Sequence, residues 1–332
     1  MKAFVHEGTK GFAGVRIDEF DSPGIGENDV KIKLKTAGLN HRDLFVLNLH
    51  DETAPPIIIG SDGAGIIEET GKNVTRVKTG DDVLVNPSLR WFEKSDAPPE
   101  DFRVLGLPDH GTFAEQIVLT EDQVEPKPAY LSWNEAGVLS LASLTAYRAL
   151  FTRAGITKGD TVFLPGVGSG AVTFLLQFAK AAGARVIITS RSEQKREQAL
   201  KLGADLALSS EENWEEALQD ETIDVVVETV GAATFNKSLS ILRKGGTMVT
   251  FGASAGDKVE LDLRSFFYGQ YNLLGTTMGS RDEYQEMLSF ITKHGIRPVM
   301  DTTYSLDNVR EAFERMQEAK QFGKIALAIQ DG

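Results

Sequence analysis

Apolar and polar positions change their spacing along the chain, and the first third has the spacing of strands. Short alternating runs such as residues 30–35 are separated by turns that contain Gly, Asp and Asn. This period of two predicts half-buried β-strands. From Leu89 to His110 the pattern is lost in a segment with Pro98-Pro99 and several charges, long enough to predict a lobe or lid. Strand-like residues resume over 111–118.

From about Ser132 the spacing becomes helical. Ser132 and Glu135 have the spacing of a capping box, and the helical pattern continues to about Ala154. Strand-like apolar runs then alternate with amphipathic helical segments, in the order 161–164, 171–182, 186–189, 193–202, 225–228, 235–242 and 248–251. Repetition of strand and helix at this spacing predicts a parallel sheet with helices on both faces.

The last part of the chain returns to mixed strand and helix and ends in a strand-like run over 322–328. We therefore expect an α/β protein with a nucleotide-type domain, residues 126–274, inserted into a β-rich domain made of 1–125 and 275–332. A chain of 332 residues is long enough for two cores, and two domains are expected to form a cleft.

Composition narrows the class of partner. Hydrophobic residues are 41% and charged residues 25% of the chain, as in ordinary globular proteins, and the net charge of −13 opposes binding to nucleic acid. A single basic pocket for a small phosphate remains compatible with that charge. The N-terminal residues lack an apolar secretory core, and no apolar run approaches the roughly 20 residues of a membrane span. We expect a cytoplasmic protein without a membrane partner.

The chain contains no cysteine. This excludes disulfides, thiol nucleophiles, iron–sulfur clusters and every zinc site with thiolate ligands. The sequence therefore directs the search for chemistry to other residue types.

A glycine-rich motif, Gly166-Val167-Gly168-Ser169-Gly170-Ala171, lies between a predicted strand and a predicted helix. It matches the dinucleotide fingerprint with Ala171 at the third small position. Gly166 permits a tight turn, Gly168 removes a Cβ that would block a pyrophosphate, and the helix after it offers free N–H groups to negative charge. The motif predicts a dinucleotide site.

The residues after the second predicted strand favour NADP(H) over NAD(H). An NAD-specific site usually has Asp or Glu there, whereas this chain has Ser190-Arg191-Ser192 with Lys195 one helical turn later. Hydroxyls and two cations suit a 2′-phosphate. The alternative is a solvated helix start, in which Ser192 caps the helix and Arg191 faces water.

Several further motifs occur in an order that resembles the medium-chain dehydrogenase/reductase superfamily, specifically its zinc-independent quinone oxidoreductase-like branch. The resemblance spans the chain and rests on residues 37–44, 60–68, 80–83, 144–147, the glycine motif, 202–205 and 322–324. It implies a GroES-like β-rich catalytic domain joined to a Rossmann domain with a doubly wound parallel sheet.

The zinc-dependent members of this superfamily hold a catalytic metal with Cys, His and Cys ligands. In this chain Asn40 stands at the position of the first Cys and Ser61 at that of the His, while Asp62 keeps the acidic character often found beside them. The 89–110 segment keeps the length of the structural zinc lobe without its thiols. We expect no metal, because the five histidines are not at ligand-like spacing either.

The resemblance also implies roles for individual residues. Asn40 and Thr145 are expected near the nicotinamide ribose and ring, and His41 and Lys324 near the pyrophosphate or ribose. The residues expected to line the cofactor cleft are Phe251, Gly252, Ala253, Thr276, Thr277 and Met278. Structural alternatives are that Asn40 caps a helix, Thr145 bonds its own helix backbone and Lys324 is a surface cation.

Without a metal, hydride transfer is easiest onto a conjugated acceptor, whose developing charge hydrogen bonds alone can hold. The position of the family's proton-relay histidine holds Phe45, so the proton is expected from solvent, with His41 or His50 as alternatives. An apolar acceptor pocket, or alternatively ordinary core, is expected around Trp91, Phe92 and Tyr147.

The leading hypothesis is an NADPH-dependent reductase of quinones or α,β-unsaturated carbonyl compounds. The alternatives are a zinc-free NADP-linked alcohol or ketone dehydrogenase and an NADPH-binding structural or regulatory protein. A homodimer or homotetramer is expected, since relatives often join their nucleotide domains edge to edge, and the apolar segment 266–274 is a candidate edge.

Overall fold

The computed structural model describes residues 1–330 and divides into two compact units. Unit 1 comprises Met1–Leu144 and the chain from Gly279 onward, and unit 2 comprises Thr145–Met278. Unit 2 is thus inserted into the sequence of unit 1, but the borders differ from the predicted ones. Residues 126–144 belong to unit 1 and residues 275–278 belong to unit 2, the reverse of the prediction. The first difference has a packing reason: Gly137 lies so close to Thr36 that a Cβ would approach the Thr36 side chain to 2.6 Å.

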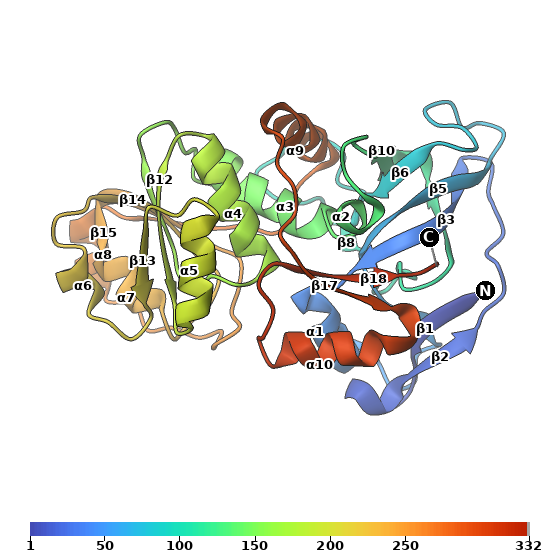
Figure 1. Ribbon diagram of the computed structural model, residues 1–332, viewed down its shortest axis with the longest axis horizontal. Coiled ribbons are helices and arrows are strands. Elements are labelled where there is room, and N and C mark those ends of the chain that lie inside the picture. The colour runs from blue at the N-terminus through green and yellow to red at the C-terminus, as the bar shows by residue number, and fades with distance from the viewer. Residues whose placement is uncertain (331–332) are drawn as a thin grey trace. The chain divides into compact units, whose positions relative to one another are not determined.

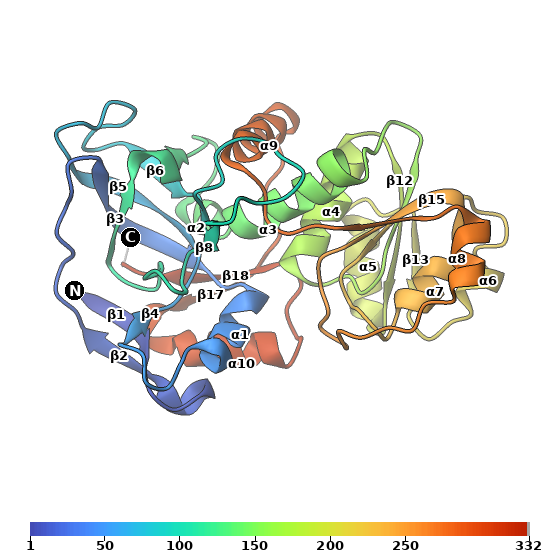
Figure 2. The ribbon, with the colours of Figure 1, turned by 180° about the vertical axis from the view of Figure 1, so that it is seen from behind.

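Unit 2 is a doubly wound sheet of six parallel strands in the order β13-β12-β11-β14-β15-β16. Helices α4 and α5 cover one face, and α6, α7 and α8 cover the other (Figures 1 and 2). The strands are β11 (Thr161–Leu164), β12 (Arg185–Ser190), β13 (Leu206–Ser209), β14 (Ile223–Glu228), β15 (Leu242–Thr250) and β16 (Asn272–Gly275). The helices are α4 (Gly170–Ala181), α5 (Glu193–Lys201), α6 (Trp214–Ala217), α7 (Phe235–Ser240) and α8 (Leu263–Gly269). Phe163, Trp214 and Met248 belong to its apolar core.

The predicted helical stretch after Ser132 is broken into pieces. Ser132 does form a capping box with Glu135 at the start of α2 (Trp133–Gly137). A second helix, α3 (Ser140–Tyr147), then begins where the N–H of Leu141 donates to the Asp62 carboxylate at 2.7 Å, and a π-helix, η3 (Arg148–Arg153), follows it. The carboxylate favours a new helix start because it satisfies an N–H of the first turn.

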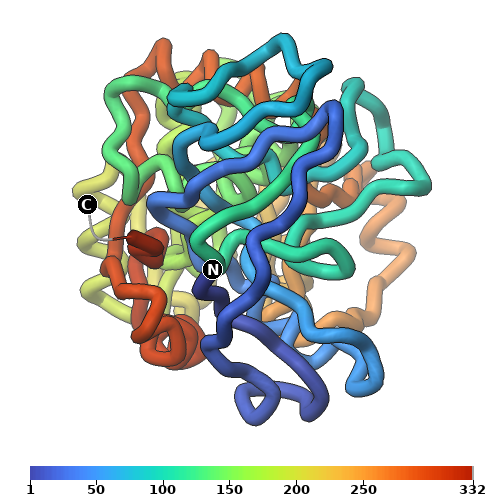
Figure 3. The backbone as a smooth tube through the Cα atoms, turned by 90° about the vertical axis from the view of Figure 1, so that its right-hand side faces the viewer, coloured from blue at the N-terminus to red at the C-terminus, as the bar shows by residue number. Residues whose placement is uncertain are grey.

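Unit 1 contains three sheets and both described ends of the chain (Figure 3). The largest has the order β10-β6-β5-β3-β18-β17, with β9 also paired to β3. The strands are β1 (Lys2–His6), β2 (Val15–Glu19), β3 (Asp29–Gly38), β4 (Ile57–Ile58), β5 (Asp62–Thr70), β6 (Asp82–Val85), β7 (Ser88–Leu89), β8 (Arg103–Val104), β9 (Gln116–Thr120), β10 (Val124–Pro126), β17 (Met300–Ser305) and β18 (Lys324–Ala328). The other helices are η1 (Gly11–Gly14), α1 (His41–Leu49), η2 (Glu121–Gln123), α9 (Arg281–His294), η4 (Leu306–Asn308) and α10 (Val309–Gln317). Phe4, Phe113 and Phe313 pack together in its core.

The predicted lobe over 89–110 is held by strand pairing, aromatic packing and hydrogen bonds to one arginine. Its short strands β7 and β8 pair, and buried Trp91 packs edge-on against Phe102. The guanidinium of Arg42, on α1, donates to the carbonyl oxygens of Val104, Leu105 and Leu107 at 3.1–3.2 Å. Aromatic packing and one guanidinium therefore anchor the lobe.

None of the helices within residues 1–330 is long and apolar enough to cross a membrane.

Candidate functional site

The glycine motif forms the predicted turn between β11 and α4. Gly166 and Gly168 have φ of +74° and +141°, and a Cβ on Gly166 would approach Val230 Cγ2 to 2.6 Å. Ser169 caps α4, its Oγ accepting from the N–H of Val172 at 3.3 Å. The turn therefore presents backbone rather than side chains in front of the first N–H groups of a 12-residue helix, which is an arrangement suited to a phosphate.

The end of β12 combines hydroxyls and cations. Ser190 Oγ accepts from the N–H of Ser192, and Ser192 in turn caps α5 by accepting from the N–H of Lys195. Ser192 therefore caps the helix, and Arg191 is exposed. Both observations agree with the alternative interpretation of these residues as a solvated helix start.

The side chain of Lys195 lies over the glycine turn. Its Nζ is 2.9 Å from the position that a Cβ of Gly168 would occupy, so the lysine spans the two parts of the predicted site. Arg196 is a third cation here, and its guanidinium donates to the carbonyl of Ser190 at 2.8 Å. Arg196 was not among the residues predicted from the sequence. Its position next to Lys195, in the first turn of α5, could have indicated it.

Loops after β14 and β15 complete the carboxyl edge of this sheet. Gly252 lies against Thr229, where a Cβ would come within 2.3 Å of the carbonyl oxygen. The structure thus places Phe251, Gly252 and Ala253 at the same sheet edge as the glycine turn, since carboxyl ends of parallel strands share an edge.

Strand β16 ends at the same sheet edge, and the residues that follow it begin there. Thr277 is exposed, and buried Met278 has φ of +42°. The Oγ1 of Thr145 lies 3.9 Å from Met278 Sδ, so two predicted site residues from the ends of unit 2 are in contact. The buried Oγ1 of Thr276 has no hydrogen-bond partner among the described residues, which fits a site for a polar ligand.

Unit 1 contains a buried polar cluster, which we call the Lys324 cluster and define as Asn40, Ser61, Asp62 and Lys324. The exposed fractions of these side chains are at most 5%. The ammonium of Lys324 donates to Asn40 Oδ1 at 2.6 Å, to Asp62 Oδ2 at 3.0 Å and to the Leu39 carbonyl at 2.9 Å. Asn40 Nδ2 donates to Asp62 at 2.9 Å and, less closely, to Ser61 Oγ at 3.5 Å.

These contacts bear on three predicted roles. The three hydrogens of the Lys324 ammonium already have acceptors, which leaves none for a cofactor phosphate. Asn40 is the N-cap residue of α1, which agrees with the alternative prediction that it caps a helix. Its side chain is hydrogen-bonded within the Lys324 cluster. His41 is exposed, with its ring packed edge-on against Phe45. A cofactor contact by Asn40, His41 or Lys324 stays a prediction.

Asp43 lies beside the cluster and was missed by sequence reasoning, although its position three residues after Asn40 is typical of a capping box. It is fully buried, and Oδ2 accepts from the N–H of Asn40 at 2.8 Å, while Oδ1 has no hydrogen-bond partner among the described residues. Burial raises the pKa of this carboxyl to about 7, against the opposing effect of the Asn40 N–H. Asp43 therefore titrates near neutrality.

The proton-donor candidate His50 lies in a buried pair. Its Nδ1 is 2.9 Å from His6 Nδ1, and both side chains are at most 4% exposed. One ring must donate and the other accept, so the pair requires at least one neutral imidazole. This burial keeps His50 away from solvent. Among the residues proposed for an acceptor pocket, Trp91 is core and Phe92 is 43% exposed.

The histidine pair predicts a pH-dependent stability. Burial, and then the positive charge of His50, lower the pKa of His6, so this imidazole binds fewer protons in the folded protein than in the unfolded chain between its lowered pKa and about pH 6.5. The contribution of this pair to the free energy of unfolding should therefore fall as the pH drops from 7.5 to 5.5, while the raised pKa of Asp43 acts in the opposite direction. Urea unfolding at each pH measures it. The exposed His294→Gln variant should keep the pH dependence of the unmodified protein, whereas His6→Gln should lose less stability on acidification than that protein does. Equal pH dependence in the two variants would contradict the assignment.

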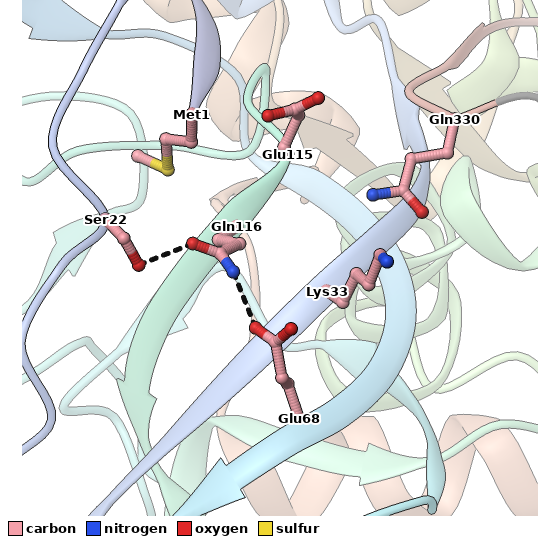
Figure 4. Close-up of a pocket in the computed structure, with 7 residues that line it drawn as sticks. All are labelled: Met1, Ser22, Lys33, Glu68, Glu115, Gln116 and Gln330. Carbon is pink, nitrogen blue, oxygen red and sulfur yellow. Dashed lines mark hydrogen bonds between the residues drawn. The ribbon is translucent and has the colours of Figure 1, made fainter.

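One hollow on unit 1 lies outside the candidate site. It is an open polar pocket of about 360 Å³, in which Gln116 bridges Ser22 and Glu68 (Figure 4). Lys33 and Glu68 are exposed. Because it holds no buried unpartnered group, we assign it no function.

Two family models match the chain. Residues 26–129 match the alcohol dehydrogenase GroES-like domain, and residues 166–293 match the domain described as zinc-binding dehydrogenase. These matches confirm the predicted fold class, with a GroES-like domain in unit 1 and a Rossmann-type sheet in unit 2.

Similar proteins span almost the whole chain. A zinc-type alcohol dehydrogenase-like protein of Schizosaccharomyces pombe is 33% identical over 347 residues, covering 99% of each chain. A crotonyl-CoA reductase of Streptomyces avermitilis is 31% identical over 373 residues, covering 96% of this chain and 83% of the reductase. The crystal structure of an NAD-dependent alcohol dehydrogenase superposes with a TM-score of 0.92 at 31% identity, covering 99% of this chain and 100% of that one.

The residues of this chain do not fit the zinc that these names imply. The sequence has no cysteine, and the described residues contain no group of three His, Asp or Glu side chains able to hold a metal. At the positions that the resemblance assigns to zinc ligands, Asn40 and Ser61 belong to a cluster that already contains a cation, the Lys324 ammonium. A second cation there would be repelled.

Proposed function

Because the chain belongs to the medium-chain dehydrogenase/reductase superfamily of oxidoreductases, we propose that it reduces quinones or α,β-unsaturated carbonyl compounds with NADPH and without a catalytic metal. The observation that carries this proposal is the Lys324 cluster. Its ammonium, amide and carboxylate satisfy one another where a metal site would need thiolate or imidazole ligands. No step of the reaction is therefore assigned to zinc.

The residues proposed to hold NADPH lie in unit 2. The glycine turn and the N-terminus of α4 are suited to the pyrophosphate, and Ser190, Arg191 and Lys195 to the 2′-phosphate. Arg196 adds charge beside them. No carboxylate stands at the end of β12 to repel the phosphate, since that strand ends in Ser190. Bound NADPH supplies the hydride, and the protein orients it and excludes water.

The choice of acceptor follows from the missing Lewis acid. An isolated ketone develops a localised negative charge on accepting hydride, whereas a quinone or enone spreads that charge over a conjugated system. Hydrogen-bond donors and solvent protons then suffice. A relative named crotonyl-CoA reductase supports this choice, because its named substrate is an unsaturated thioester. The acceptor would be a small molecule, and a cytoplasmic location stays a prediction.

A second candidate is a zinc-free alcohol or ketone dehydrogenase that uses NADP. It is favoured by the similarity to proteins named alcohol dehydrogenase. Absorbance at 340 nm separates the candidates: we expect NADPH oxidation with quinones and enones and no NADP⁺ reduction with saturated alcohols. Turnover confined to saturated alcohols and ketones would establish the second candidate instead.

We also propose that unit 2 carries a dimer interface. β16 is an edge strand of the described sheet, and the helix before it exposes Leu263, Phe267 and Tyr268 by 68%, 52% and 66%. An unpaired strand edge beside exposed apolar side chains suits pairing with the same edge of a second copy.

Introducing charge into this edge should change the oligomeric state. The double variant Phe267→Glu/Tyr268→Glu is expected to elute as a monomer in light-scattering chromatography, while the unmodified protein elutes as a dimer or tetramer. Leu200→Glu is the matched control, since Leu200 is 46% exposed on another helix of the same unit. Loss of assembly in the control, or a dimer that survives the double change, would place the interface elsewhere.

A further inference from the structure

Glu228 is a buried carboxylate at the carboxyl end of β14, and its exposed fraction is 0%. Its Oε1 accepts from the N–H groups of Val230 and Gly231 at 2.7 and 3.1 Å and from the Thr234 hydroxyl at 2.9 Å. Its Oε2 lies 2.9 Å from the Thr234 hydroxyl and 2.7 Å from that of Ser238. The structure gives it no ion pair among the described residues, so neutral donors alone hold it.

These hydrogen bonds fix the first residues of the loop after β14. The two backbone donors, Val230 and Gly231, turn toward the same oxygen, and Gly231 has φ of +97°. Thr234 and Ser238, which donate from the other side, lie at the start of α7 and within it. One side chain thus ties the end of a strand, a tight loop and a helix together.

The loop held by Glu228 contacts both neighbouring loops at the carboxyl edge. Val230 packs on Gly166, the first glycine of the fingerprint. The Val230 carbonyl accepts from the N–H of Ala255 at 2.7 Å, and the N–H of Ala232 donates to the Gly256 carbonyl at 2.9 Å. The loop after β14 therefore connects the glycine turn to the segment that follows Ala253.

We propose that Glu228 is a positioning residue, which holds the loops after β11, β14 and β15 in the arrangement that NADPH binding requires. The proposal rests on the proposed cofactor site in unit 2. Glu228 acts through the loop and need not touch the cofactor. A carboxylate is required because all of its partners donate, whereas the amide of a glutamine would place its own N–H groups against some of them.

The chain offers a matched control on the same strand. Asp224 lies four residues earlier, toward the amino end of β14, and its carboxylate accepts from the N–H of Thr161 at 2.8 Å and from the Arg243 guanidinium at 2.6 Å. Its neutralisation weakens one backbone hydrogen bond and one ion pair at the opposite end of the strand. A change at Asp224 therefore shows the effect of lost stability alone, without an effect on the loops that position the cofactor.

The experiment compares NADPH dissociation constants, kcat at saturating NADPH and melting temperatures. Glu228→Gln should raise the Kd for NADPH on the order of tenfold with a smaller change in kcat, and Glu228→Asp should restore part of the affinity. Asp224→Asn should lower the melting temperature while leaving Kd unchanged. An unchanged Kd in a folded Glu228→Gln protein overturns the proposal.

Two further outcomes are distinguishable. If the unmodified protein binds no NADPH, the proposed function fails, and with it the premise for Glu228. If Glu228→Gln does not fold, the milder Ser238→Ala variant removes a single donor and should raise the Kd a few-fold, on the order of one neutral hydrogen bond. No rise in that variant would overturn the role of Glu228.

Discussion

Replacing Lys324 with methionine is expected to lower the free energy of unfolding by about 3–5 kcal/mol, the usual cost of removing one partner from a buried ion pair. Methionine keeps much of the side-chain volume but leaves the Asp62 carboxylate, Asn40 Oδ1 and the Leu39 carbonyl without their cationic donor. Because stability is commonly about 5–15 kcal/mol, the variant should fold but unfold at much lower urea concentration.

The matched control is Lys320→Met. Lys320 is exposed and pairs with Glu318 on the surface, where such pairs contribute about 0–1 kcal/mol. Adding Asp62→Asn to Lys324→Met should recover part of the loss, because it removes the uncompensated buried charge. If Lys324→Met is no more destabilising than the control, the ammonium is not the centre of the cluster.

Removing the cations after β12 is the second large change. Arg191→Ala/Lys195→Ala should raise the KM for NADPH, since hydrogen bonds to charged groups contribute about 1.5–3 kcal/mol each, or roughly 10- to 150-fold. The KM for NADH should rise less, because NADH lacks the 2′-phosphate and keeps only the pyrophosphate near the glycine turn that Lys195 covers. Initial rates with each cofactor measure both constants.

The same strand supplies the control for that variant. Arg185 lies at the amino end of β12, where it pairs with Glu221. Arg185→Ala removes a cation of unit 2 far along the strand from Ser190 and should leave the preference for NADPH intact. A parallel rise in both KM values for the double variant would mean that the cations support the site in general rather than the 2′-phosphate.

The architecture of unit 2 was accessible from the sequence because apolar runs and amphipathic helices repeat with two distinct periods. The fingerprint turn and the capping box at Ser132 were predicted at the correct residues. The short strand β13 and the break between α2 and α3 were not. That break depends on Asp62, which is distant in sequence from Leu141, and local periodicity carries no information on such contacts.

The site was predicted unevenly for the same reason. Residue types in a known motif identify the glycine turn and the hydroxyls and cations after β12. The Lys324 cluster joins residues more than 250 positions apart, so its internal satisfaction is visible only in the fold. The roles of Asp43, Arg196 and Glu228 likewise depend on which neighbours fold against them. The sequence shows that these three residues are charged. Only the folded structure shows whether each charge contacts a ligand or other protein groups.

The most direct test of the central proposal is NADPH oxidation at 340 nm by protein that has been dialysed against a chelator, with a quinone or an enone as acceptor and NADH in parallel. We expect turnover that chelation does not reduce, that added zinc does not raise, and that NADPH supports better than NADH. Activity that is lost on chelation and returns only with zinc would contradict it.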